Sequence, residues 1–148
     1  MRENTSLAAW QRGEQTIGLW LSLANAYSAE AMSKLGFDWV CVDMQHGLID
    51  YTDLVNMLPA ISNSSATPLV RVPWNEPYEI MKALDAGAYG VIVPMVNNRE
   101  EAEQAVMDAA LDALANARAI ISAETQESCT GASSGCASAA RLRVPLDT

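Results

Sequence analysis

The sequence has little that suits several common protein classes. Its 148 residues include one histidine, three cysteines and no apolar run near the ~20 residues that a membrane-spanning helix needs. Cys41, Cys129 and Cys136 are odd in number and form no C-x-x-C pair, so a reduced, cytoplasmic setting is expected. Cys41 lies in an apolar run and is interpreted as a small buried hydrophobic residue. The first 15 residues contain no hydrophobic segment, so no signal peptide is predicted.

Positive charge is also scarce. Nine Lys and Arg stand against 18 Asp and Glu, which gives a net charge of −9. Such an acidic surface repels phosphate backbones, so neither nucleic acid nor a membrane is expected as a partner. No Gly-rich phosphate-binding loop is visible, which disfavours an isomerase or decarboxylase that uses a phosphate site. Half of the residues are hydrophobic, so one globular domain can bury a core.

Apolar runs alternate with helical patterns from residue 16 to about residue 106. The runs are continuous rather than alternating, as in strands that are covered on both faces. Repeated strand–helix units predict an α/β protein with a parallel sheet, either doubly wound or closed as a barrel. The predicted strands are 16–24, 38–43, 67–73 and 89–96, and the predicted helices are 28–36, 50–62, 77–87 and 98–119.

Several helix ends can be predicted from capping residues. Ser28 is the predicted N-cap of the first helix, and Gly36 is its predicted stop. The second helix is expected to kink or end near Pro59. The third helix has Pro77 in its first turn and Gly87 at its end, the usual asymmetry of helix termini.

The composition changes after about residue 106. Residues 107–148 are rich in Ala and Ser, and only the stretch RAIIS resembles a strand. The segment TQESCTGASSGCASAA is close to low complexity, so disorder or loose packing is expected there. We therefore divide the chain into a strand–helix part, 1–106, and a divergent tail, 107–148, that is partly helical at its start.

Polar residues follow the predicted strands at the points where they end. His46 comes directly after the run DWVCVD, and Arg71 lies within PLVRVPW. Chemistry collects at the carboxyl ends of parallel strands, so both side chains are expected at one edge of the sheet. A guanidinium in a buried strand is costly unless an anion pairs with it. That anion can be a substrate, or it can be Asp43 or Asp85.

Purely structural interpretations remain open for each of these residues. His46 can be a satisfied structural residue at a strand end. By pattern alone, Asp85 is a solvated residue in the last turn of its helix, and Asp38 and Asp50 look like turn and capping residues. The large residues Trp20, Trp39 and Met95 are more often core than ligand contacts.

The segments GLWLSLANAYSAEAMSKLGFDWVCVDMQHGLIDY and PLVRVPWNEPYEIMKALDAGAYGVIVPMVNNREEAEQAV resemble the HpcH/HpaI aldolases, a family of metal-dependent 2-oxo acid aldolases. DMQH, VRVPWN, LDAG and VPMV occur in the family's order and spacing, between about Gly18 and Val106. The resemblance implies a (β/α)8 TIM barrel, of which this chain supplies about the first four units. It also implies reversible aldol cleavage of a 4-hydroxy-2-oxo acid into pyruvate and an aldehyde.

The resemblance also implies roles for individual residues. His46 is expected to be the general base, and Asp85 to orient it. Arg71 is expected to contact the pyruvate oxygens and stabilise the enolate, with Trp20 and Gln45 as further substrate-binding residues. An imidazole suits a base that works near neutral pH, and a developing oxyanion needs fixed positive charge. A divalent Mg²⁺ or Mn²⁺ ion and a homo-oligomer are implied as well.

Other family motifs are missing. The glutamate and aspartate that bind the metal come from later strands, in motifs such as I-E-T and G-x-x-D-L-S, and neither they nor R-Y-P-P-x-G are recognisable here. Glu124 in SAETQE arrives too early to be given this role, so no metal ligand is identified. We expect the chain to be the N-terminal portion of such a barrel and inactive alone. The alternative is a non-catalytic half barrel that self-associates or pairs with an intact subunit. A reading-frame shift after about Val106 is a further hypothesis for the tail.

Overall fold

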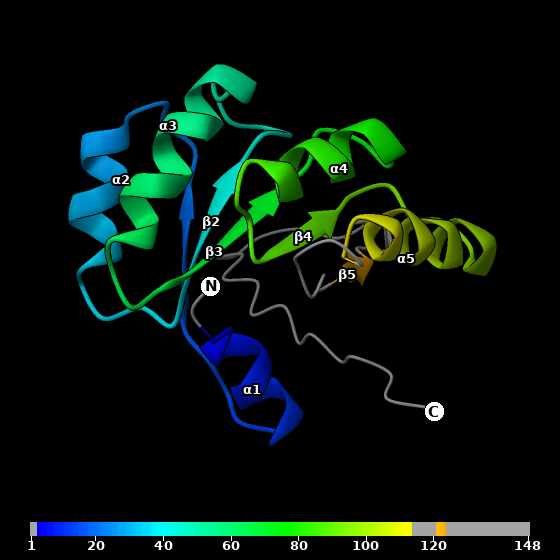
Figure 1. Ribbon diagram of the computed structural model, residues 1–148, viewed down its shortest axis with the longest axis horizontal. Helices are drawn as coiled ribbons and strands as arrows, with labels where there is room; N and C mark the ends of the chain where they lie inside the picture. Colours follow the sequence, from blue (N-terminus) through cyan, green and yellow to red (C-terminus); the bar gives the residue numbers. More distant parts are fainter. Residues whose placement is uncertain (1–2, 114–120, 124–148) are drawn as a thin grey trace, which may run out of the picture.

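The computed structural model describes residues 3–113 and 121–123 (Figure 1). In this part of the chain, parallel strands form one sheet in which each strand pairs with the next along the sequence. The strands are β1 (Gly18–Leu21), β2 (Trp39–Asp43), β3 (Thr67–Arg71), β4 (Gly90–Val93) and β5 (Ile121–Ala123). The predicted α/β class with a parallel sheet is confirmed.

Helices connect the strands in regular alternation. The first, α1 (Thr5–Gln11), precedes β1, and one helix then lies between each strand and the next (Figure 1). These connecting helices are α2 (Ala26–Ser33), α3 (Tyr51–Ser62), α4 (Pro77–Asp85) and α5 (Arg99–Ala113). None of the described helices has the length and hydrophobicity needed to cross a membrane.

Side chains of each strand alternate between two buried layers. On β2, Val40 and Val42 join the larger core, which the connecting helices complete with residues such as Leu54 of α3 and Ile80 of α4. Cys41 points the other way, into a smaller cluster with Leu7 of α1, Leu69 and Ile92. Because successive strand residues face opposite sides, both layers draw on the same apolar runs. This explains why the strand sequences are continuously apolar rather than alternating between apolar and polar residues.

The predicted strands and connecting helices are all present, but the two ends predicted for the first connecting helix were wrong. Asn25, not Ser28, caps α2: its side chain accepts a hydrogen bond from the Ser28 N–H at 2.8 Å, and the helix ends at Ser33, before Gly36. Asn caps a helix as well as Ser does, so the two were not separable by residue type. Pro59 does not end α3, which runs to Ser62 as the predicted range 50–62 does, and the alternative of a kink at Pro59 stays a prediction.

The course of α3 past Pro59 has a packing cause. Leu54, Met57, Leu58 and Ile61 are all buried, and they lie on both sides of the proline. Their burial outweighs the one backbone hydrogen bond that proline removes. At its start, α3 is held by a capping box in which Asp50 and Asp53 bond each other's backbone N–H groups.

The helix α1 was not predicted. Asn4 caps it by accepting from the Leu7 N–H at 3.0 Å. Ser6 fixes it to the sheet by donating to the Asp38 carbonyl at 3.0 Å and by a hydroxyl–hydroxyl hydrogen bond with Thr67 Oγ1 at 2.9 Å. This helix has only seven residues, TSLAAWQ, and carries no charged side chain. Its stability therefore comes from these tertiary bonds rather than from its own propensity.

The C-terminal predictions are only partly testable. Helix α5 runs through the proposed boundary at residue 106 to Ala113, and the rest of the predicted helix, up to 119, lies outside the described residues. Strand β5 lies at the end of the RAIIS stretch, with one residue beyond it. The division into 1–106 and 107–148 stays a prediction. The low-complexity segment, whose disorder was predicted, lies outside the described residues.

The core makes a direct prediction about α4. Ile80 is fully buried in the larger core, so Ile80→Ala leaves a cavity and is expected to lower the free energy of unfolding by about 2–5 kcal/mol. Its neighbour Met81 is 43% exposed, so Met81→Ala should change that free energy by less than about 1 kcal/mol. Urea unfolding followed by circular dichroism measures both, and equal losses would contradict the packing described.

Candidate active site

A buried ion pair lies at the carboxyl edge of the sheet. Asp43 and Arg71 are register partners at the ends of β2 and β3. Arg71 Nε donates to Asp43 Oδ1 at 2.9 Å, and Arg71 Nη2 donates to Asp43 Oδ2 at 2.6 Å. Their side chains are only 13% and 4% exposed. Of the two carboxylates considered as protein partners of Arg71, the structure therefore pairs it with Asp43.

The carboxylate of Asp43 also organises the loop that follows β2. Its Oδ1 accepts hydrogen bonds from the backbone N–H of Gln45 at 3.0 Å and of His46 at 3.2 Å. Burial raises the pKa of this carboxyl, but hydrogen bonds from Arg71, Trp20 and the His46 amide, together with the arginine's charge, lower the pKa to about 2. Asp43 is therefore an anion across the physiological pH range.

Trp20 packs against the ion pair from β1. The Arg71 Cζ atom lies 4.9 Å from the centre of the Trp20 ring, a cation–π contact. Trp20 also meets Trp39 edge-on, with ring centres 6.4 Å apart, and stays 37% exposed. Trp20 is thus partly packed and partly open at the edge where a substrate would approach.

The loop that carries His46 is held at both ends. Before the histidine, Asp43 accepts the backbone N–H groups, and after it the Leu48 N–H donates to the Ser22 carbonyl at 3.1 Å. Gly47 follows His46 because a Cβ there would lie 2.2 Å from the Asp43 carbonyl oxygen. The His46 residue itself is exposed. The fold thus presents the imidazole to solvent on a tightly fixed backbone.

Asp85 lies elsewhere. It is the exposed last residue of α4, and the chain then turns through Gly87 into the start of β4. Since β2 and β4 are parallel, the start of β4 and the end of β2 are at opposite edges of the sheet. The structure therefore brings together Arg71, Trp20, Gln45 and the His46 backbone, but it does not bring Asp85 to His46 within one chain.

Asp43 bonds both Arg71 and the loop that follows β2. From the sequence, it was considered only as a possible partner for Arg71. One signal could have given it more weight. It opens the DMQH motif and ends a strand next to the one that carries Arg71, so parallel pairing makes the two neighbours. Gly47 was likewise missed, because a close backbone approach leaves no trace in composition.

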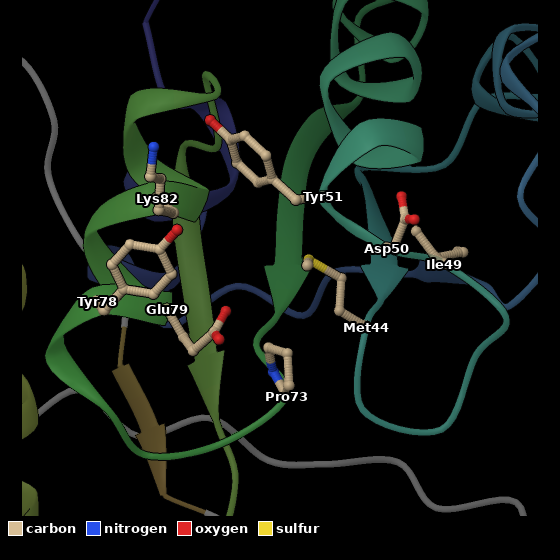
Figure 2. Close-up of a pocket in the computed structure, with 8 residues that line it drawn as sticks. All are labelled: Met44, Ile49, Asp50, Tyr51, Pro73, Tyr78, Glu79 and Lys82. Carbon is tan, nitrogen blue, oxygen red and sulfur yellow. The ribbon is translucent and has the colours of Figure 1, made fainter.

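A pocket of about 300 Å³ lies on the helix side of this edge (Figure 2). Lys82 extends between two of its aromatic walls, with Nζ 5.2 Å from the Tyr51 ring centre and 5.7 Å from that of Tyr78. We call the Asp43–Arg71 pair, with Trp20 and the Gln45–His46 loop, the edge site. Neither Arg71 nor His46 lines the pocket, so the pocket is separate from the edge site. The lining residues are Met44, Ile49, Asp50, Tyr51, Pro73, Tyr78, Glu79 and Lys82.

The described residues do not form a metal centre. Nowhere in residues 3–113 and 121–123 do three or more His, Cys, Asp or Glu side chains come together in a way that could hold an ion. At the edge site, both oxygens of Asp43 already accept hydrogen bonds from Arg71. The divalent ion that the resemblance implies therefore finds no set of ligands in this part of the chain.

Comparison with known proteins identifies the group to which the chain belongs. The family model described as HpcH/HpaI aldolase/citrate lyase matches residues 16–113. The chain is a member of this family. The resemblance found in the sequence is confirmed, and the open sheet described above is part of the family's barrel.

Curated relatives of this HpcH/HpaI chain are named as aldolases. A hydroxypyruvate/pyruvate aldolase from Rhizorhabdus wittichii is 46% identical over 100 residues, which cover 68% of this chain and 40% of the relative. A 4-hydroxy-2-oxo-heptane-1,7-dioate aldolase from Escherichia coli is 41% identical over 104 residues, which cover 70% and 40% of the two chains. The chain thus spans about 40% of the length of these relatives.

Two solved structures share the fold of this chain. A family protein from Burkholderia cenocepacia J2315 superposes with a TM-score of 0.69 at 28% identity, covering 80% of this chain and 59% of that one. The citrate synthase SbnG gives a TM-score of 0.67 at 28% identity, covering 78% and 53%. Both matches agree with the parallel sheet and its covering helices.

The Asp43 carboxyl predicts how stability depends on pH. Its folded pKa of about 2 lies below the ordinary value of 3.8, so the folded state favours the ionised form. At about 1.36 kcal/mol per unit, this shift contributes about 2 kcal/mol of stability, which is complete above about pH 4 and is lost as the pH falls towards 2. Asp43→Asn should therefore flatten the dependence of unfolding free energy on pH in this range, as measured by urea unfolding at several pH values. Equal slopes in both proteins would count against the ion pair.

Gly47 gives a second prediction. Gly47→Ala forces a Cβ against the Asp43 carbonyl oxygen, so it is expected to displace the loop and to destabilise the fold by about 1–3 kcal/mol. The backbone amide signals of Gln45 and His46 should shift in an NMR spectrum. Leu48→Ala is the matched control, since Leu48 is 80% exposed in the same loop and its side chain can be removed without such a clash. Unchanged Gln45 and His46 signals in Gly47→Ala would refute the close approach.

Proposed function

We propose that the carboxyl edge of this sheet is part of an aldolase active site that cleaves a 4-hydroxy-2-oxo acid into pyruvate and an aldehyde. The observation that carries the proposal is the convergence of Arg71, Trp20 and the His46 loop on one carboxylate at this edge. Membership of a family whose relatives are named as pyruvate and 4-hydroxy-2-oxo acid aldolases supports the reaction class.

In this proposal, His46 acts as the general base. It takes the proton from the C4 hydroxyl group, the C3–C4 bond breaks, and the electron pair passes to C3, giving an aldehyde and the enolate of pyruvate. Protonation at C3 then releases pyruvate. Imidazole suits the first step because it accepts a proton near neutral pH, and the exposure of His46 leaves it open to substrate.

Arg71 is proposed to stabilise the enolate. A guanidinium is always charged and presents several donors in one plane, which suits the carboxylate and developing oxyanion of a 2-oxo acid. The packing of the Arg71 guanidinium on Trp20 and its two hydrogen bonds to Asp43 hold it in one orientation before a substrate binds. Trp20 and Gln45 are proposed as further substrate contacts from the neighbouring strand end and loop.

The proposed site needs more than the described residues provide. A divalent ion, Mg²⁺ or Mn²⁺, is expected from the family, but the described residues offer no ligand set for it. We therefore keep the proposal that the chain is inactive alone. The second candidate, a half barrel that associates with itself or with an intact subunit without catalysing a reaction, is favoured by the same observation and by the 40% coverage of the relatives.

Asp85 is proposed to act only between chains. Its carboxylate lies at the edge of the sheet opposite His46, so it cannot orient the histidine of its own chain. In the proposed homo-oligomer, Asp85 of one copy orients His46 of a neighbouring copy, which is the role that the resemblance implies for Asp85.

A hybrid enzyme tests the proposed chemistry directly. Residues 18–106 replace the matching segment of the Rhizorhabdus aldolase, which supplies the rest of its barrel. With Mn²⁺ or Mg²⁺, the hybrid is expected to release pyruvate, measured by a coupled dehydrogenase assay. His46→Ala should lower kcat by about 10²–10⁴-fold, because it removes the base. Leu48→Ala should leave kcat within about twofold, since its exposed side chain lies outside the proposed chemistry.

The outcomes separate the two candidates. An active hybrid that keeps its rate in His46→Ala would overturn the assigned base, and a hybrid that folds but never turns over would favour the non-catalytic half barrel. The chain by itself should give no turnover at any metal concentration. Light scattering on the same sample then reports whether it self-associates.

A further inference from the structure

One residue at the proposed site has no part in the proton transfer described above, although it has the most contacts. Asp43 is 2% exposed and receives hydrogen bonds from three separate parts of the chain: β1, β3 and its own following loop. Its Oδ1 alone accepts from Arg71 Nε, Gln45 N and His46 N. A buried carboxylate with this many partners calls for an explanation beyond charge balance.

Asp43 is poorly suited to react. Its two oxygens offer about four lone-pair positions, and the bonds from Arg71, Gln45, His46 and Trp20 use them. A carboxylate whose pKa is about 2 is also a weak base at neutral pH. Its contacts instead join the two groups that the proposed reaction uses, the guanidinium of Arg71 and the backbone that carries His46.

Sharing one oxygen has a geometric consequence. If the guanidinium turns away, Oδ1 loses a donor and the electrostatic reason for its position, and the amide groups of the loop lose a fixed acceptor. The loop cannot compensate by shifting, because Gly47 already lies against the Asp43 carbonyl and the Leu48 N–H is bonded to Ser22. The arginine and the histidine loop are thus fixed relative to each other by one side chain.

We propose that Asp43 is a positioning residue, which holds the Arg71 guanidinium and the Gln45–His46 backbone as one unit and so sets the distance between the oxyanion-stabilising group and the base. This inference rests on the proposed function for the roles of Arg71 and His46. The coupling of the two groups through Asp43 is a property of the fold and is measurable without turnover.

The substitution Asp43→Asn separates the two halves of this role. Its carbonyl oxygen still accepts from the Gln45 and His46 amides and from Arg71 Nε, whereas its NH₂ group faces Arg71 Nη2 as donor against donor. In NMR spectra of the full chain, Asp43→Asn should shift the Arg71 Nη2–H signals and speed their exchange with water by about tenfold or more, while the Gln45 and His46 amide signals remain. Asp43→Ala should perturb all three.

Asp38→Asn is the matched control. Asp38 accepts the Ile17 N–H at 2.7 Å just before the start of β2, so this variant makes the same chemical change far from the edge site. It should leave the Arg71, Gln45 and His46 signals unchanged. If Asp43→Asn leaves the Arg71 Nη2–H signals in place and equally protected, or if the control moves them as much, Asp43 does not position the arginine.

A double-mutant cycle in the hybrid enzyme shows whether the effect passes through Arg71. Asp43→Asn is expected to lower kcat by about 10–100-fold, more than it changes KM, because a misplaced guanidinium loses transition-state contacts. With Arg71→Lys already present, the same change should cost less than about threefold. Equal costs in both backgrounds would overturn the positioning role. A hybrid without turnover would count against the proposed function alone, because the spectra still decide the inference.

Discussion

The candidate site depends on one ion pair that is buried between two adjacent parallel strands. Asp43 and Arg71 are opposite each other in register, so the strand pairing itself delivers the carboxylate and the guanidinium to the same place. Burial of either charge alone costs several kcal/mol of stability, and the pairing of the two charges offsets this cost. Trp20 and the Gln45–His46 backbone both make contacts to this pair.

The fold follows from the sequence wherever burial decides the structure. Runs such as DWVCVD are covered on both faces, and residues of β2 indeed alternate between the two buried layers. Helix ends were less predictable, because Asn25 and Ser28 are equally good caps and the choice depends on packing. The effect of Pro59 was also hard to predict, because packing of the buried residues on both sides of it lets α3 continue to Ser62. Helix α1 was missed because side-chain bonds to Asp38 and Thr67 hold it.

The site was predictable in part and for a definite reason. Parallel strands place their carboxyl ends together, so His46 and Arg71 could be assigned to one edge from the strand pattern alone. Asp85 could not be placed in that way, because a residue at the end of the following helix returns to the opposite edge. A resemblance transfers a role to a residue, but it does not state whether that role is filled within one chain. The assigned roles remain predictions.

The bidentate salt bridge between Asp43 and Arg71 has a consequence for how anions bind at this edge. Because the guanidinium shares its charge with a carboxylate held at 2.6 Å, the pair is neutral as a whole and presents an oriented dipole. Under the proposed function, a 2-oxo acid would meet directional donors at this edge without a strong long-range field from this pair. Its capture should depend little on ionic strength, and a product carboxylate should leave without having to escape a full positive charge.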